Sequence, residues 1–271
     1  MSDEKRPPIL ADKNYDMPSA FTPENLLREA RRQKAAPVDP VPDICLLDPD
    51  GDVVRRLKAD GRARRHEGWV CYHTELYVFD ENGLTLGVLG CAVGSSFAVL
   101  VAEELFVSGC KLLISVTSAG QITPVQAPPY FILIDRALRD EGTSYHYMPP
   151  SNYSDAPEAL LGALEGAFDD LEIPVLKGAT WTTDAPFRET QDAIDGVRRH
   201  GLLAVEMEAA ALYAFARARG KPVICFAHVT NQMGQTEGDF EKGPADGTTD
   251  ALRIVLKAAQ RLIDTGELPL G

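Results

Sequence analysis

Two carboxylates flank Met207 in a segment that is otherwise apolar. Residues 204–211 read AVEMEAAA, which places Glu206 and Glu208 two positions apart. The small and apolar residues around them, 202–220, predict a single helix. Because residues two apart on a helix point about 200° away from each other, the two carboxylates need different partners. Either one of them faces a ligand cleft while the other binds backbone or a neighbouring chain, or both only complement the dipole of the first helical turn.

Polar or small residues also follow several predicted strands. In open α/β sheets, ligands bind beyond the carboxyl ends of the strands, so these positions are candidates for a site. They are Asp50-Gly51-Asp52, residues 94–96 (GSS), residues 115–120 (SVTSAG) and Thr230-Asn231. The glutamate pair is the fifth such element.

The elements that must position these residues alternate between strands and helices. The first half predicts a strand at 44–48, a hairpin from 71–79 and 84–90, a helix at 97–109 and a strand at 111–120. Strand, glycine-bearing turn, helix and strand form a βαβ unit, which implies parallel strands. The second half predicts a helix at 157–171, a strand at 174–184, the helix at 202–220, a strand at 222–231 and a closing helix at 251–264.

These elements predict one α/β domain with a mixed, mostly parallel central sheet and helices on both faces. We expect this domain to span residues 42–271. Residues 1–41 are expected to form an N-terminal arm with a short helix, for which Thr22 is the N-cap and Pro23 lies in the first turn.

Charge and cysteine usage limit the partners of the chain. Its 27 Lys and Arg against 40 Asp and Glu give a net charge of −13, which would repel nucleic acid and anionic membranes. An anionic ligand must therefore find a local positive site. The five cysteines contain no C-x-x-C pair, which is typical of reduced thiols, and no second pair joins Cys225 and His228 to make a metal site. No segment approaches the roughly 18 apolar residues of a membrane span, so we expect a cytoplasmic protein.

Five short motifs occur in a distinctive order. They are GD-x-x-R at 51–55, EEL at 103–105, SAG at 118–120, TTD at 182–184 and VEMEAAAL at 205–212. In this order they resemble the nucleoside phosphorylase family, which includes uridine phosphorylase, hexameric purine nucleoside phosphorylase and related nucleosidases. The likeness runs from about residue 42 to 262, and the E-M-E segment is its most specific part.

The resemblance implies phosphorolysis, in which phosphate attacks C1′ of a nucleoside and the base leaves. It implies phosphate as co-substrate without a further cofactor or metal, and a homo-oligomer built from dimers, up to a hexamer. Glu208 matches the family glutamate that accepts hydrogen bonds from the ribose hydroxyls, and Met207 matches the residue that packs on the sugar. Such charge-assisted bonds can strengthen as the sugar gains positive charge. Glu206 is then a structural partner.

The resemblance also supplies phosphate ligands. Gly51 and Arg55 have the spacing of the family's glycine amide and arginine, and Ser118 matches the residue that bridges phosphate and sugar. The alternative for Arg55 is a solvated charge in a basic run. His73 lies near the position where the family lends a phosphate ligand to a neighbouring subunit, but a histidine on a strand surface is the other interpretation.

One departure bears on the nucleophile. The family strand carries an arginine that binds phosphate, where this chain has Ser115. Either another cation replaces it, with Arg64, Arg65 or Arg188 as candidates, or water attacks instead, as in the nucleosidases. A third alternative is a nucleoside-binding protein that keeps the fold without turnover.

The base pocket departs too. Phe187, Arg188 and Gln191 keep the residue types that read uracil in uridine phosphorylases, but in a different order. Phe187 either stacks on a base or belongs to the core. Asn231 stands where hexameric purine enzymes carry an aspartate as general acid, and an amide can hydrogen-bond N7 and a 6-oxo group. The sequence favours a 6-oxopurine nucleoside and leaves uridine open.

Overall fold

The computed structural model describes residues 7–233 and 237–268. The strands are β1 (Ile44–Asp48), β2 (Arg64–Arg65), β3 (Leu76–Glu81), β4 (Leu84–Gly90), β5 (Leu112–Gln121), β6 (Tyr130–Asp140), β7 (Tyr153–Asp155), β8 (Val175–Thr183), β9 (Ala204–Glu206) and β10 (Val223–Asn231). The α-helices are α1 (Pro23–Lys34), α2 (Asp52–Ala59), α3 (Ser95–Val107), α4 (Ser144–Tyr147), α5 (Glu158–Ala163), α6 (Gln191–Arg199), α7 (Ala209–Arg219) and α8 (Thr248–Asp264). Short 3-10 helices are η2 (Pro8–Leu10), η3 (Pro186–Arg188) and η4 (Pro244–Gly247).

The described strands form one sheet in the order β10-β6-β8-β9-β5-β1-β4-β3-β2, with β7 paired to β6. Strand β10 also pairs with β5, so that β10, β6, β8, β9 and β5 close into a ring. The strands β4, β1, β5 and β10 are parallel to one another, and so are β6, β8 and β9. Their shared direction brings the carboxyl ends of β1, β4, β5 and β10 to one edge, where a ligand site is expected.

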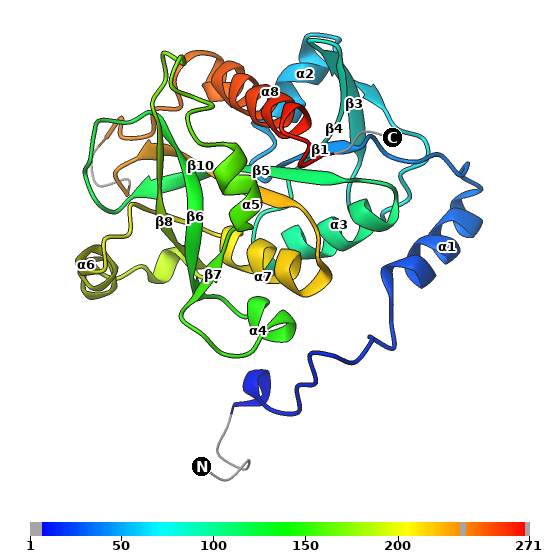
Figure 1. Cartoon of the computed structure of the whole chain (residues 1–271), viewed down its shortest axis with the longest axis horizontal. Coiled ribbons are helices and arrows are strands. Elements are labelled where there is room, and N and C mark those ends of the chain that lie inside the picture. Colours follow the sequence, from blue (N-terminus) through cyan, green and yellow to red (C-terminus); the bar gives the residue numbers. More distant parts are fainter. Residues whose placement is uncertain (1–6, 234–236, 269–271) are drawn as a thin grey trace.

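Helices cover both faces of the central strands. In Figure 1, α2 and α8 lie on one side of β1, β5 and β10, and α3 and α7 lie on the other. Every residue of β1 and of β10 is buried, which explains why both strands appear as continuous apolar runs in the sequence. The predicted α/β domain with a mixed sheet and two helical layers is thus confirmed.

Several predicted elements match the structure closely. Thr22 caps α1 by accepting a hydrogen bond from the Asn25 amide at 3.4 Å. The predicted hairpin is β3 and β4, although β3 begins only at Leu76. No described helix is both long and apolar enough to cross a membrane. The division of the chain at residue 42 stays a prediction.

Three predictions need correction. The helix expected at 157–171 is only the short α5, because the chain leaves the helix after Ala163 in a series of turns. Neither α2, which begins at Asp52 directly after Gly51, nor β6 is among the predicted elements. The largest error concerns 202–220, where β9 comes before α7.

Candidate active site

The glutamate pair lies at a strand-to-helix junction and not on one helix. Glu206 ends β9, Met207 follows, and Glu208 is the N-cap residue of α7. The helix predicted over 202–220 is wrong before Ala209, because β9 pairs with β5 and β8 and these ladder bonds outweigh local helix propensity. The two carboxylates do have different partners, as expected, but the reason is that each is bound by its own set of donors.

Glu206 anchors the start of α7 to the sheet. Its side chain is 3% exposed, and it accepts hydrogen bonds from the hydroxyls of Thr180 (3.1 Å) and Thr182. The backbone amides of Glu208 and Ala209 each donate to the same carboxylate at 2.7 Å. Burial raises the pKa of Glu206, while these four donors favour its ionised form. With its acceptor sites taken by the fold, Glu206 has the structural role that the sequence suggested.

Glu208 has fewer hydrogen-bond partners than Glu206, and they come from other segments of the chain. It is 1% exposed, and its Oε1 accepts from the Gly94 amide at 2.7 Å while its Oε2 accepts from the Thr117 hydroxyl at 2.9 Å. A carboxylate offers about four lone-pair positions, so capacity remains for two further donors. Burial, followed by the charge of Glu206, raises the pKa of Glu208 to about 8. The Glu208 carboxyl group can therefore accept further hydrogen bonds, and it changes between its protonated and ionised forms near pH 8.

Two of the three predicted phosphate ligands lie in the turn between β1 and α2 and in the first turns of α2, namely Gly51 and Arg55. Gly51 has φ +79°, and a Cβ there would lie 2.7 Å from the Cys91 sulfur and 2.9 Å from Arg55 Nη1, so the position requires glycine. The Arg55 side chain is 60% exposed, and its Nη2 donates to Asp52 Oδ1 at 2.5 Å and to the Asp50 carbonyl at 2.9 Å. Arg55 is an exposed cation at the rim of this turn, paired with Asp52, so both its role as a phosphate ligand and its interpretation as a solvated charge stay predictions.

Asp50 connects this turn to the end of β5. Its Oδ2 accepts a hydrogen bond from the Ser118 amide at 2.9 Å. The negative charge of Asp50 also contributes to the raised pKa of Glu208. The structure thus brings together Gly51, Ser118 and Glu208, whose segments meet at the ends of β1, β5 and β9. The Ser118 amide is occupied by a carboxylate of the chain itself.

Asn231 lies at the same edge of the sheet. It ends β10, is 8% exposed, and its Oδ1 accepts from the Met233 amide at 2.9 Å. Its Nδ2 donates to the Thr230 hydroxyl at 3.1 Å. Asn231 also pairs with Gly120 of β5, where a Cβ would lie 3.3 Å from its Oδ1. Asn231 therefore lies beside Gly120, which follows Ser118 by two residues in β5.

The other three predicted base ligands lie on the surface of the chain. Phe187 is 97% exposed in η3, so its interpretation as a core residue is wrong. Arg188 and Gln191 are also exposed, and the Gln191 amide donates to Asp195 at 2.9 Å within α6. Within residues 7–233 and 237–268, no hydrogen bond or ion pair joins these three side chains to Glu208. Their assignment to a base stays a prediction.

His73 and the two arginines of β2 lie in other parts of the fold. His73 is exposed in the loop before β3, so its interpretation as a strand residue is wrong, and its ring meets Phe97 edge-on at 6.2 Å. Arg64 and Arg65 form β2 at the outer end of the sheet order and pair with nearby acidic residues. Neither arginine is in contact with the β1–α2 turn in the described part of the chain.

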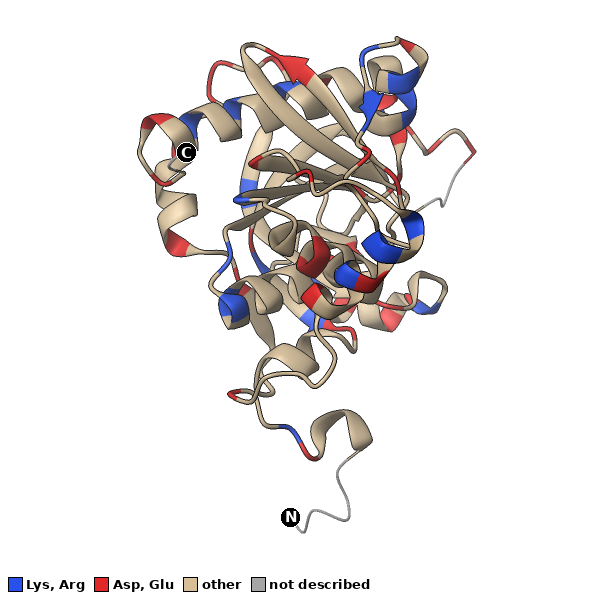
Figure 2. Cartoon of the chain, turned by 90° about the vertical axis from the view of Figure 1, so that its right-hand side faces the viewer, with Lys and Arg blue, Asp and Glu red and all other residues tan. Residues whose placement is uncertain are grey.

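Lys242 is the site residue that sequence reasoning missed. Its ammonium group bonds Asp52 Oδ2 across 190 positions of sequence, a pairing that no local pattern signals. Burial opposes the charge on Lys242, but the bond to Asp52 outweighs it and raises the pKa of the lysine. Figure 2 shows Lys and Arg alternating with Asp and Glu over the helices and turns of one side of the molecule. Beside Asp52, positive charge comes from two individual side chains, Arg55 and Lys242.

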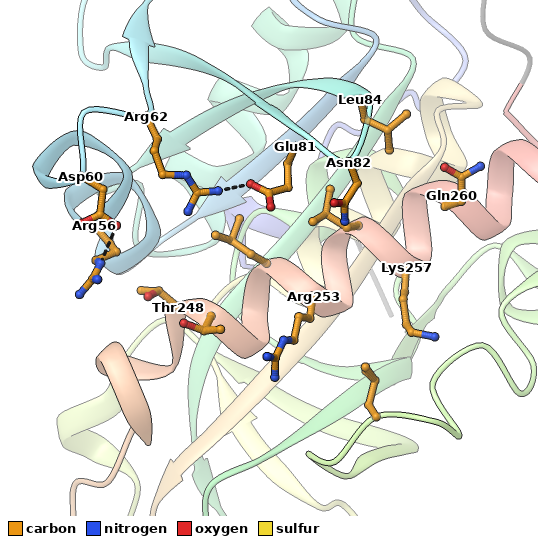
Figure 3. A pocket seen from close by; sticks show the side chains of 14 residues that line it. Arg56, Asp60, Arg62, Glu81, Asn82, Leu84, Thr248, Arg253, Lys257 and Gln260 are labelled. Atoms are coloured by element: carbon orange, nitrogen blue, oxygen red, sulfur yellow. Dashed lines mark hydrogen bonds and ion pairs between the residues drawn. The ribbon is translucent and has the colours of Figure 1, made fainter.

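A separate pocket lies between α8, the end of α2 and the β3–β4 turn (Figure 3). It measures about 560 Å³, and none of the predicted site residues lines it. Its basic residues are paired with acids: Arg56 bonds Asp60 at 2.8 Å, and Arg62 bonds Glu81. None of the predicted strand-end elements lines this pocket. Asp50, Ser118, Glu208 and Asn231 lie instead at or next to the ends of β1, β5, β9 and β10.

Comparison with known proteins identifies the family and gives the same fold. Residues 43–265 match the family model described as the phosphorylase superfamily. Guanosine phosphorylase from Halorubrum lacusprofundi is 27% identical over 67% of this chain and 78% of its own length. Uridine phosphorylase from Thermococcus kodakarensis is 28% identical over 68% of this chain and 70% of its own length. The crystal structure of uridine phosphorylase from Vibrio fischeri has the same fold, with a TM-score of 0.70, 21% identity, and coverage of 85% of this chain and 96% of that one.

Proposed function

The chain belongs to the phosphorylase superfamily, and we propose that it is a nucleoside phosphorylase acting on purine nucleosides. Nucleoside phosphorylases are pentosyltransferases, and the similar proteins named above carry this activity in their names. In the proposed reaction an oxygen of phosphate bonds to C1′, and the bond between C1′ and the base nitrogen breaks with its electrons going to the base. The products are free base and ribose 1-phosphate.

The buried carboxylate of Glu208 is the observation that carries the proposal. It is 1% exposed and held by the Gly94 amide and the Thr117 hydroxyl, which leaves acceptor positions for two ribose hydroxyls. When this carboxylate is ionised, its negative charge favours the positive charge that develops on the sugar as the base leaves. Met207, directly before it and half-buried, is proposed to pack on the sugar.

Phosphate is proposed to bind at the β1–α2 turn. Gly51 gives this turn a residue without a side chain, although its amide donates to the Asp48 carbonyl at 2.9 Å. Arg55 supplies a guanidinium, and Ser118 offers a hydroxyl between phosphate and sugar. A guanidinium can bind phosphate through two parallel hydrogen bonds. We also propose a homo-oligomer, in which the exposed His73 is available to a neighbouring subunit.

A 6-oxopurine is the base that we propose. Asn231 carries an amide that can donate to one base atom and accept from another, which suits N7 and a 6-oxo group. It is not an acid, so the proton for the leaving base must come from solvent or another group. The similarity to a guanosine phosphorylase supports this choice, and the similarity to a uridine phosphorylase keeps uridine as the alternative.

One observation favours hydrolysis as a second candidate. Asp50 Oδ2 accepts from the Ser118 amide at 2.9 Å, so a negative charge lies beside the serine whose hydroxyl we assign to phosphate. A carboxylate in this position can accept a proton from water, and water would then attack C1′ to give free ribose.

Product analysis separates the two reactions. Purified protein is incubated with inosine, guanosine, adenosine and uridine, each with and without phosphate, and free base, ribose 1-phosphate and ribose are measured. Ribose 1-phosphate formed only with phosphate supports the phosphorylase. Ribose formed at the same rate without phosphate refutes it and supports hydrolysis. No release of base from any of the four nucleosides contradicts both.

A further inference from the structure

Strand β5 brings no positive charge to the proposed phosphate site. Its residues, LLISVTSAGQ, include neither lysine nor arginine. Ser115 in this strand is 1% exposed, and its hydroxyl has no hydrogen-bond partner among the described residues. A phosphate dianion beside Asp50 and Asp52 needs more than one cation, because like charges in a partly buried site repel strongly. The second cation must come from another segment.

Lys242 reaches this site from the loop after β10. Asp52 accepts from Arg55 at one carboxylate oxygen and from Lys242 at the other. One carboxylate therefore holds a guanidinium and an ammonium on its two sides, next to the Gly51 turn. Asp52 is 20% exposed and Lys242 30% exposed, so both remain accessible to a small anion. Burial opposes the charge on Asp52, but the bonds from the two cations outweigh it and lower its pKa.

His228 lies beside Ser118 on the neighbouring strand β10. It pairs in register with Ser118 on the neighbouring parallel strand, so the two side chains point to the same face of the sheet. Its ring stacks on Phe131 at 4.2 Å, and its Nε2 is buried without a partner among the described residues. Burial, followed by the charge of Lys242, lowers the pKa of His228 to about 4, which keeps the ring neutral at neutral pH. An unpaired polar atom thus lies on the strand beside Ser118, on a ring that the charge of Lys242 reaches.

We propose that Lys242 is a phosphate-binding residue that supplies, together with Arg55, the positive charge missing from β5. The proposal rests on the proposed phosphorolysis. In it, the ammonium group donates to a phosphate oxygen while Asp52 keeps Lys242 and Arg55 oriented. No proton is transferred, since the lysine stays charged throughout.

The test compares Lys242→Met with Lys242→Arg and with a matched control. Methionine keeps the length of the stem and removes the charge, and arginine restores the charge. Lys257→Met is the control, because Lys257 is a lysine of similar exposure (35%) that pairs with Asp170 at the separate pocket of Figure 3. We expect the KM for phosphate to rise about 10- to 100-fold in Lys242→Met, since a charge-assisted bond is lost. The KM for nucleoside should change less than about threefold, Lys242→Arg should recover most of the phosphate affinity, and Lys257→Met should match the wild type.

A second readout needs no turnover. Phosphate alone should raise the Tm of the wild-type protein by binding the folded state, and Lys242→Met should lose most of this increase. An unchanged phosphate KM and Tm increase in Lys242→Met, with a wild type that needs phosphate, would overturn the role of Lys242 and leave the proposed function intact. A wild type that ignores phosphate in turnover and in Tm would instead refute the proposed function, and this inference with it.

Discussion

Replacing Glu208 by glutamine tests the sugar-binding role with little change of shape. The amide oxygen can accept from the Gly94 amide, and the amide nitrogen can donate to the Thr117 hydroxyl, so both contacts of the buried side chain persist. What disappears is the negative charge and one acceptor group. We therefore expect a folded variant whose defect is confined to catalysis.

The size of this defect follows from the bonds that Glu208 has left to make. Hydrogen bonds to a charged group contribute about 1.5–3 kcal/mol and neutral ones about 0.5–1.5 kcal/mol. Weakening two ribose bonds from charged to neutral costs about 2–3 kcal/mol, which is roughly a 30- to 150-fold loss in kcat/KM. A substrate without one ribose hydroxyl should lose less in the variant than in the wild type, because the two changes remove the same bond.

The pH profile adds an independent check. With a pKa of about 8, Glu208 is protonated at lower pH, and only the ionised form accepts two charge-assisted bonds. Wild-type kcat/KM should therefore increase with pH up to about 8, and the glutamine variant should lack this increase. The assay is the initial rate of base release at saturating phosphate across about pH 6–9, with Tm measured alongside. A kcat/KM within about threefold of the wild type, or an unchanged pH profile, would refute the assignment of Glu208.

Further predictions concern phosphate, stability and pH. Arg55→Ala should raise the KM for phosphate about 10- to 100-fold, since a guanidinium that binds phosphate is lost, and an unaltered value in a phosphate titration would place phosphate elsewhere. Asp50→Asn should lower the KM for phosphate several-fold by removing a negative charge beside the serine whose hydroxyl we assign to phosphate, and a higher KM would contradict this repulsion. Glu206→Ala should destabilise the protein by about 3 kcal/mol or more in urea unfolding, because four buried donors lose their acceptor, and a loss under about 1 kcal/mol would argue against its anchoring role. Burial raises the pKa of Asp48 to about 7, so the folded chain holds this proton better than the unfolded chain; Tm should fall as pH rises from about 4 to 7, and Asp48→Asn should flatten that slope in thermal melts.

The fold was predictable where local pattern and tertiary environment agree. The strands β1 and β10 are buried along their whole length, and their sequences are continuous apolar runs. Strand β6 escaped prediction because its second half carries charged residues. One of them, Arg139, is 4% exposed and is satisfied by hydrogen bonds to Ser144, Ser151 and the carbonyls of Met148 and Pro149, a network that only the folded chain reveals.

The site was predictable to the extent that its residues follow strands. Glu208, Ser118 and Gly51 were found from motifs, but their mutual placement depends on distant pairings. Residues 204–206 have helical neighbours in sequence and became a strand only because β5 and β8 offer free edges. Lys242 could not have been found at all, since its partner Asp52 is 190 positions away.

The two hydrogen bonds of Glu208 affect when the folding chain acquires its proposed nucleoside site. They join residues that are 114 and 91 positions apart, and they form only after the ends of distant strands have come together. Such long-range closure is slow, because loop entropy is lost before the contacts form. The site around Glu208 should therefore be among the last features to form during refolding, later than the spectroscopic signal of the helices. Bound nucleoside should in turn slow hydrogen exchange throughout β5 and α7, and not only at the residues it touches.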